Sequence, residues 1–222
     1  MINIQTIKEA KHICIKTQSD SFSNASALYT YILTLHKKVS LVSSESIDTK
    51  FSFLPWFDKV REMTPSSADV ILDVNSKTKE LYDFFVINDI KINKKMATSL
   101  YASLLMEYNN FHKRDTNETV FTLASELITL NAEYKLCREY LNNRVGLYEF
   151  RLKSILFKNF ILTDNARAVE VFICNDDLRQ TGAILSDVYP LLEEFFTLVH
   201  VKEVTLKKSD EKNKILINLK EK

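Results

Sequence analysis

Residues 12–43 read HICIKTQSDSFSNASALYTYILTLHKKVSLVS, and this stretch decides the fold. The short apolar run at its start predicts a β-strand, which ends at a loop of small polar residues. The pattern after the loop, with Leu28 and Ile32 on one face, predicts a helix that has Ser23 or Asn24 as its N-cap. The run KKVSLVS then predicts a second strand. Strands and helices that alternate in this way are typical of a parallel sheet, where ligands bind beyond the carboxyl ends of the strands.

The composition is that of a globular protein, with 222 residues of which 45% are apolar, enough for one large or two small domains. The formal net charge of +1 gives no overall field that would favour nucleic acid or membrane as a partner. No window approaches the roughly 18 apolar residues that a membrane span needs. Charges interrupt the only apolar stretch near the N-terminus, so we expect no signal peptide and a cytoplasmic location.

Cysteine and glycine usage exclude several kinds of site. The three cysteines have no CxxC spacing, which favours buried reduced thiols over disulfides or a zinc site. Gly146 and Gly182 are the only glycines in the sequence. Loops that cradle phosphate groups need glycine, because the backbone must approach the ligand closely. Walker-type and dinucleotide-binding loops are therefore excluded.

The remaining sequence predicts the rest of two domains. Residues 51–63 predict a short strand, a proline turn and a short helix, and ADVILDV at residues 68–74 predicts a third strand, buried on both faces. Apolar residues at helical spacing then continue to residue 162. After them, AVEVFICN predicts a strand, two helices follow, and a closing hairpin has its turn at Ser209-Asp210. We expect the domain boundary within residues 115–150.

Several segments of the sequence resemble motifs of the DHH–DHHA1 phosphoesterase family, in the RecJ-like branch of oligoribonucleases and phosphoadenosine-phosphate phosphatases. Family members open with a strand, a His-x-x-Pro-Asp-x-Asp-x-x-Gly-Ser loop and a helix, and KTQSDSFSNAS at residues 16–26 has the same frame. SADVILDVN is similar to the second motif strand and places Asp73 at its single-Asp position. MATSLYASLLMEYNN is similar to the next motif and places Glu107 where the family has Asp. The resemblance implies an α/β fold: a Rossmann-like, parallel-sheet, DHH-type domain in residues 1–128, then a helical connector and a smaller α+β, DHHA1-like domain in 129–222.

The sequence departs from the family pattern at the functional motifs. Lys16 stands at the first His of the loop, and Phe22 stands at its second Asp. The Asp-His-His triplet has no counterpart, because DVNSKTKELYDFF runs directly from the second motif into the helix that follows the triplet in the family. The Gly-Gly-Gly-His loop with which DHHA1 holds substrate is also missing from the sequence. KILINLKEK stands where the family has a strand ending in Ser-Leu-Arg-Ser, which makes Lys220 a candidate for phosphate binding.

The resemblance implies hydrolysis at a pair of manganese ions, which needs several carboxylates and imidazoles around the metals. Of the family's ligand positions, only Asp20, Asp73 and Glu107 carry acids here, and the ammonium of Lys16 would oppose a dication. We interpret these four positions and Phe22 as vestigial. We expect neither a resident metal nor a catalytic residue, and a pocket closed by a Lys–Asp pair and by Phe22.

The resulting hypothesis is a catalytically inactive homologue, a pseudo-enzyme that acts through protein–protein interaction as a cytoplasmic scaffold or regulatory factor. One alternative is a nucleotide or oligonucleotide binder that does not hydrolyse its ligand, with phosphates held by lysines such as Lys16, Lys94, Lys95 and Lys220. Another is a diverged metal-dependent phosphoesterase that acts on short oligonucleotides or phosphoadenosine phosphate. A protein partner is expected, and the sequence leaves a homodimer open.

Overall fold

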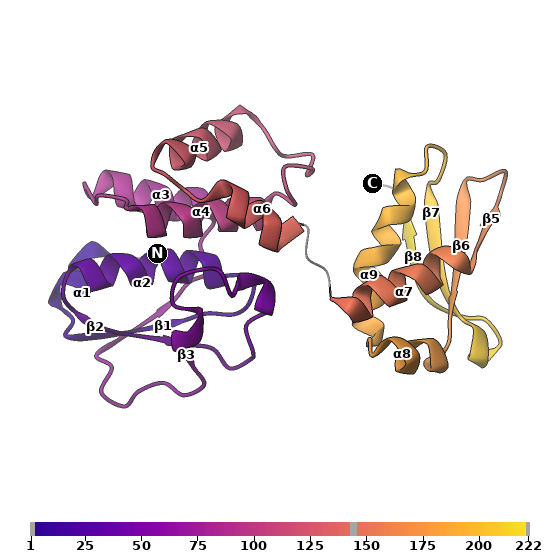
Figure 1. Cartoon of the computed structure of the whole chain (residues 1–222), viewed down its shortest axis with the longest axis horizontal. Coiled ribbons are helices and arrows are strands. Elements are labelled where there is room, and N and C mark those ends of the chain that lie inside the picture. The colour runs from indigo at the N-terminus through magenta and orange to yellow at the C-terminus, as the bar shows by residue number, and fades with distance from the viewer. Residues whose placement is uncertain (1–2, 143–145, 221–222) are drawn as a thin grey trace. The chain divides into compact units, whose positions relative to one another are not determined.

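The computed structural model describes residues 3–142 and 146–220, and the chain divides into two compact units, residues 1–144 and 145–222 (Figure 1). Each unit has its own hydrophobic core. The division lies inside the predicted window of 115–150 but after the end of the proposed first domain at residue 128. The reason is helix α6 (Tyr134–Asn142), whose buried Cys137 belongs to the core of the first unit.

A four-stranded parallel sheet forms the base of the first unit, in the order β3-β2-β1-β4. Its strands are β1 (His12–Lys16), β2 (Lys38–Val42), β3 (Val60–Arg61) and β4 (Val70–Asp73). All three predicted strands of this sheet are present. Since the strands are parallel, their carboxyl ends meet at one edge of the sheet, and the loops that follow them lie together there.

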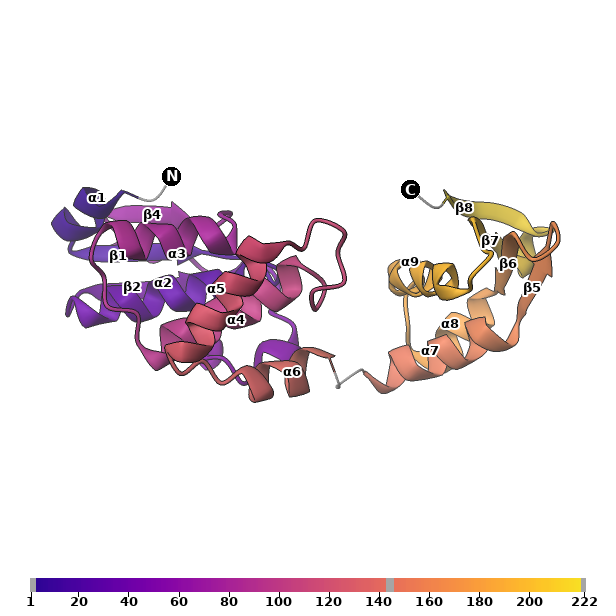
Figure 2. The same ribbon diagram turned by 90° about the horizontal axis from the view of Figure 1, so that it is seen from above.

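Helices cover one face of this sheet and stack in a second layer above it (Figures 1 and 2). They are α1 (Ile4–Glu9), α2 (Phe22–Thr34), α3 (Thr78–Ile87), α4 (Lys94–Glu107), α5 (Glu118–Thr129) and α6. Helices α2 and α4 pack closely through small polar residues, and the hydroxyl oxygens of Ser26 and Ser99 lie 3.1 Å apart between them. Short side chains at this contact let the two helix axes approach each other.

The connection from β3 to β4 packs against the other face of the sheet. The His12 ring is 3.0 Å from the hydroxyl of Ser67 and 2.9 Å from that of Ser40. The Asp69 carboxylate accepts the backbone N–H groups of Lys11 and His12, each at 2.8 Å. These bonds hold the connection beneath β1, on the face that the helices leave uncovered.

Three local predictions for the first unit were wrong. Helix α2 begins after Ser21, so Ser23 and Asn24 are buried inside the helix instead of capping it. Residues 51–63 form 3₁₀ turns (η1, Thr49–Phe51, and η2, Phe57–Lys59) followed by β3, not a strand followed by a helix. Strand β4 is not buried on both faces: it lies at the edge of the sheet, where β1 is its one strand partner among the described residues, and its Ile71 is 49% exposed.

The second unit is a mixed sheet of order β5-β6-β7-β8 with helices packed on it. Its elements are α7 (Leu147–Lys158), β5 (Phe160–Thr163), β6 (Ala168–Ile173), α8 (Asn175–Thr181), α9 (Leu185–Leu192), η3 (Glu193–Thr197), β7 (Glu203–Lys208), η4 (Ser209–Glu211) and β8 (Lys214–Lys220). The hairpin of β7 and β8 turns at the predicted place. Strand β5 was predicted as the end of a helix, but α7 stops at Lys158, and Phe160 then pairs with Val171 of β6.

The predicted α/β architecture, a parallel-sheet unit followed by a smaller α+β unit, is confirmed. Within residues 3–142 and 146–220, no helix is long and apolar enough to cross a membrane.

Candidate functional site

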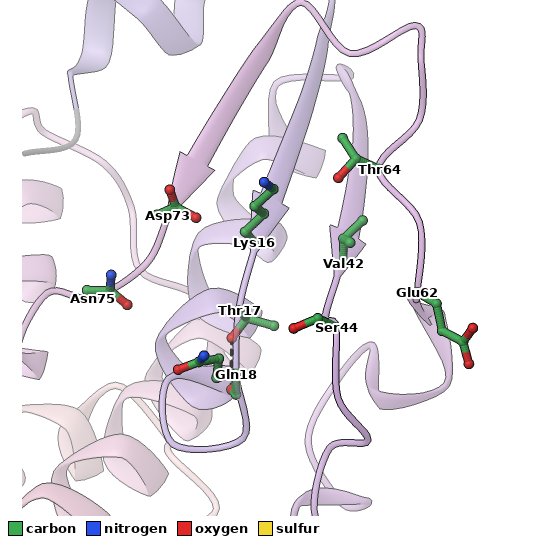
Figure 3. A pocket seen from close by; sticks show the side chains of 9 residues that line it. All are labelled: Lys16, Thr17, Gln18, Val42, Ser44, Glu62, Thr64, Asp73 and Asn75. Atoms are coloured by element: carbon green, nitrogen blue, oxygen red, sulfur yellow. Dashed lines mark hydrogen bonds between the residues drawn. The ribbon is translucent and has the colours of Figure 1, made fainter.

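The carboxyl edge of the parallel sheet is hollowed by a pocket of about 320 Å³, which we call the sheet-edge pocket (Figure 3). It lies where β1, β2 and β4 end, the place where open α/β sheets bind their ligands. Its lining consists of Lys16, Thr17, Gln18, Val42, Ser44, Glu62, Thr64, Asp73 and Asn75. The lining is mostly hydroxyl and amide groups, with one ammonium and two carboxylates.

Lys16 and Asp73 end neighbouring strands of this pocket, and they are paired in the register of β1 and β4. Figure 3 shows both side chains at the carboxyl end of the sheet, with Thr64 on the other side of Lys16. Among the described residues, no ion pair joins Lys16 to Asp73. The predicted Lys–Asp pair is therefore not formed and does not close the pocket.

Phe22 lies in the core instead of the pocket. Its side chain is completely buried, and its ring centre lies 5.9 Å from that of Phe51 and 6.0 Å from that of Phe57. The prediction that Phe22 closes the pocket is therefore wrong. Helix α2 starts at this residue, so its first turn is anchored by an aromatic cluster.

Beneath the sheet-edge pocket lies Cys14, which is buried in β1. Burial raises the pKa of its thiol, and the hydrogen bond with Thr64 and the positive charge of Lys16 act in the opposite direction but are smaller. A thiol with a raised pKa carries little thiolate at neutral pH, so Cys14 is not an activated nucleophile.

A second pocket, of about 420 Å³, adjoins the first at Asn75, which lines both. We call it the Asn24 pocket. It is built by the loop before α2, the connection from β4 to α3 and the last turn of α4. Its lining consists of Asp20, Ser21, Asn24, Asn75, Ser76, Lys77, Ser103, Met106 and Glu107. The structure thus brings Asp20 and Glu107 together, whereas Lys16 and Asp73 share the neighbouring pocket.

Glu107 has a structural partner in the Asn24 pocket. Its Oε2 accepts the backbone N–H of Thr78 at 3.0 Å. Thr78 is the first residue of α3, and Lys77, the N-cap residue, provides no side-chain cap. Glu107 therefore caps α3 from the end of α4 and satisfies a helix N–H that would otherwise lack an acceptor.

Of the other candidate lysines, Lys94 and Lys95 belong to the first unit but line neither pocket. Lys94 donates to the Glu133 carboxylate at 2.9 Å, and the Lys95 ammonium lies 4.8 Å from the ring centre of Trp56. Lys220 ends β8 in the second unit, in register with Glu203 of β7. None of the contacts described for these three lysines forms part of a phosphate-binding site.

The donor set does not fit the two manganese ions that the resemblance implies. Within residues 3–142 and 146–220, no three His, Cys, Asp or Glu side chains gather in a way that could hold a metal. The remaining acids are divided between two pockets, and the ammonium of Lys16 stands beside Asp73. A dication needs several converging carboxylates or imidazoles and is repelled by a neighbouring ammonium.

The sequence did not predict Asn75, Ser44 or Thr64 as pocket residues. A signal for two of them was present: Ser44 comes shortly after β2, and Asn75 comes shortly after β4. Polar residues just after apolar strands of a parallel sheet gather at its carboxyl edge. Thr64 belongs to the connection after β3, whose path the sequence pattern did not reveal.

Comparison with known proteins identifies solved structures that are similar in fold. No protein-family model and no curated protein matches the chain. Among solved structures, an exopolyphosphatase-related protein from Bacteroides fragilis matches with a TM-score of 0.74 and 10% identity, over 94% of this chain and 78% of that chain. A Methanococcus jannaschii protein assigned to the family II inorganic pyrophosphatases covers 89% of this chain and 83% of its own at 13% identity, but its TM-score of 0.33 carries no weight. The chain therefore shares its fold with the exopolyphosphatase-related protein.

Proposed function

We propose that this protein has kept a DHH-type fold without metal-dependent hydrolysis, and that it acts through protein–protein interaction as a cytoplasmic scaffold or regulatory factor. The main support for this proposal is the position of the Lys16 side chain. Its side chain lies in the sheet-edge pocket, where the fold offers a ligand site, and it brings a positive charge beside Asp73. Two positively charged metal ions and this ammonium would repel each other at such short range.

The distribution of the acids supports the same proposal. Asp73 lies in one pocket, and Asp20 and Glu107 lie in the other. Glu107 is engaged as the cap of α3. Two-metal hydrolysis requires ligands that clamp both ions over one substrate, about 4 Å apart, and this division of the acids opposes that arrangement.

The helices of the first unit also present large apolar side chains to solvent, which supports an interaction role. In α3, Val86 and Ile87 are 52% and 79% exposed, and in α5 Phe121 is 54% exposed. Beside α3, Leu81, Phe84 and Ile87 line a shallow pocket whose surface is mainly apolar. Exposed apolar surface of this kind is typical of sites that contact other proteins.

The test is hydrolysis in the presence of manganese. The full chain is incubated with Mn²⁺ and short oligonucleotides, phosphoadenosine phosphate or cyclic dinucleotides, and products are separated by chromatography. We expect no product above a buffer blank. Asp73→Ala and the exposed control Asp58→Ala should behave like the wild type. Metal-dependent turnover that Asp73→Ala abolishes and Asp58→Ala preserves would contradict the proposal.

A second candidate function is nucleotide binding without hydrolysis. It is favoured by the Lys16 ammonium and the hydroxyls of Ser44 and Thr64 in the sheet-edge pocket, whereas the carboxylates of Glu62 and Asp73 in the same pocket oppose a phosphate. This candidate predicts that nucleotides bind, that added salt weakens the binding, and that Lys16→Gln reduces the affinity several-fold. Calorimetric titration with phosphoadenosine phosphate at two salt concentrations separates it from the first candidate, which predicts no heat of binding.

A further inference from the structure

We propose that the Asn24 pocket binds a primary ammonium or guanidinium group, presented by a lysine or arginine side chain of a partner protein. This inference rests on the proposed function, because it names the chemistry by which a partner would be held. It depends on three properties of the pocket: buried acceptors without a partner, an excess of carboxylates, and a wall that suits an alkyl chain.

The first property is an unpartnered buried acceptor. Asn24 is 4% exposed, and its Nδ2 donates to the carbonyl of Ser76 at 2.9 Å. That bond orients the amide, and its Oδ1, which is buried, has no hydrogen-bond partner among the described residues. The hydroxyl of Ser76 is also buried and has no hydrogen-bond partner among the described residues. A buried acceptor that lacks a donor costs roughly 1–3 kcal/mol, so a ligand that donates hydrogen bonds is favoured here.

The second property is the charge of the pocket. Among the described residues that line it are two carboxylates, of Asp20 and Glu107, and one ammonium, of Lys77. The adjoining sheet-edge pocket adds Asp73, Glu62 and Lys16, so the two pockets together hold four carboxylates and two ammonium groups. This excess of negative charge favours a cation and disfavours a phosphate.

The helix dipoles do not change this conclusion. The amino end of α2 brings partial positive charge to the pocket, and the carboxyl end of α4 brings partial negative charge. At the amino end of α3, the carboxylate of Glu107 already accepts the N–H of Thr78. The partial charges at the ends of α2 and α4 have opposite signs and offset each other. The charges of the side chains therefore decide which ion the pocket prefers.

The third property is the shape of the lining. Met106 supplies an apolar wall against which the methylene groups of a lysine or arginine side chain can pack. The described residues that line the pocket include no aromatic ring on which a nucleobase could stack. An alkyl chain with a cationic, hydrogen-bond-donating end meets all three properties, whereas the phosphate of a nucleotide is disfavoured by the charge and its base finds no aromatic ring in the lining.

Nuclear magnetic resonance titration of the ¹⁵N-labelled full chain tests the proposal. The ligands are capped Ala-Lys-Ala and Ala-Arg-Ala, with capped Ala-norleucine-Ala as an uncharged control of similar shape, and inorganic phosphate as an anion. We expect the two basic peptides to shift the amide signals of residues 20–24, 75–77 and 107, and the norleucine peptide and phosphate to leave them in place. Equal shifts with the norleucine peptide, or larger ones with phosphate, would overturn the proposal.

Two variants with the same change in charge sharpen the test. Asp20→Asn removes a pocket carboxylate that is exposed and has no described hydrogen bond, so the fold should be unaffected. Asp58→Asn removes an exposed carboxylate that lines neither pocket. We expect Asp20→Asn to weaken binding of the lysine peptide about fivefold, which corresponds to about 1 kcal/mol, and Asp58→Asn to change it by less than about twofold. Equal affinities of the two variants would contradict the assigned site.

A further ligand distinguishes an ammonium group on a protein side chain from one on a free polyamine. Free spermidine that shifts the same amides while both peptides leave them in place would overturn the assignment to a protein side chain. The result of this test can be distinguished from the result of the test of the proposed function. Metal-dependent hydrolysis would overturn the proposed function, whereas absent peptide-induced shifts without hydrolysis would overturn only this site.

Discussion

Phe22 and Glu107, which the sequence resemblance places at metal-binding positions of another family, have structural roles in this chain. Phe22 fills the core between Phe51 and Phe57, and Glu107 caps α3. Neither role needs a ligand. A substitution at these residues is therefore expected to act on stability, which distinguishes them from Lys16 and Asp20, whose side chains make no described hydrogen bond or ion pair.

The first prediction concerns Phe22. Phe22→Ala should lower the free energy of unfolding by about 3–5 kcal/mol, because it leaves a cavity in the aromatic cluster. Phe22→Leu keeps most of the volume and should cost clearly less. Urea unfolding followed by circular dichroism measures both. Phe121→Ala, at a residue that is 54% exposed, is the control; if it costs as much as Phe22→Ala, the assignment of Phe22 to the core is wrong.

The second prediction concerns Asp69 and pH. Backbone N–H groups of His12 and Lys11 hold the pKa of this carboxyl below its usual value. A lowered pKa in the folded state means that the ionised carboxylate stabilises the fold above its unfolded pKa of about 4, and that this stabilisation is lost as the pH falls through the folded pKa. Asp69→Asn should therefore lower the Tm at pH 7, and the difference from wild type should shrink below pH 4. A difference in Tm that stays constant from pH 7 to pH 3 would contradict this account.

At the scale of elements, the helices of the first unit begin in different ways. Asn93 and Asn117 are the N-caps of α4 and α5, and their side-chain oxygens accept first-turn N–H groups. Helix α2 has Ser21 as its N-cap residue, without a side-chain cap, and depends on the burial of its first turn. The asparagine caps follow local rules, whereas the start of α2 is set by packing.

The third prediction concerns the cap of α5. Asn117→Ala should destabilise the protein by about 1 kcal/mol, because the N–H groups of Thr119 and Val120 lose their acceptor. Asn117→Asp keeps an acceptor and adds a charge that the amino end of a helix favours, so it should be neutral or slightly stabilising. Equilibrium unfolding in urea compares the two variants with wild type. Equal losses for both would show that the cap is not the source of the effect.

At the scale of the whole molecule, the chain builds two separate cores. Unit 1 is centred on β1, α2 and α4, and unit 2 on β6, β7 and the helices α7 and α9. Residues 1–144 and 145–222 are each large enough to bury a core, although a unit of this smaller size buries a lower share of its surface. Stability is therefore expected to differ between the units.

The fourth prediction concerns this division. Leu206, in β7, is completely buried, and Leu206→Ala should destabilise unit 2 by about 2–5 kcal/mol. Hydrogen exchange read by mass spectrometry should show faster exchange in β6 and β7, with exchange in β1 and β2 unchanged. Leu28→Ala, in the core of unit 1, should give the opposite pattern. Loss of protection in both units from either variant would show that they unfold together.

The sequence by itself determined strands β1, β2 and β4, the helix α2 between the first two, the hairpin at the end of the chain and the positions of Lys16 and Asp73 near two strand ends, because periodicity and turn residues are local signals. Tertiary structure alone decided which residues share a pocket. It made β4 an edge strand, moved Phe22 into the core, placed Glu107 on α3 and left Asn24 with an unpartnered oxygen. These outcomes depend on contacts between segments that lie 29 or more residues apart, such as the hydrogen bond from Asn24 to Ser76, and no local pattern carries that information.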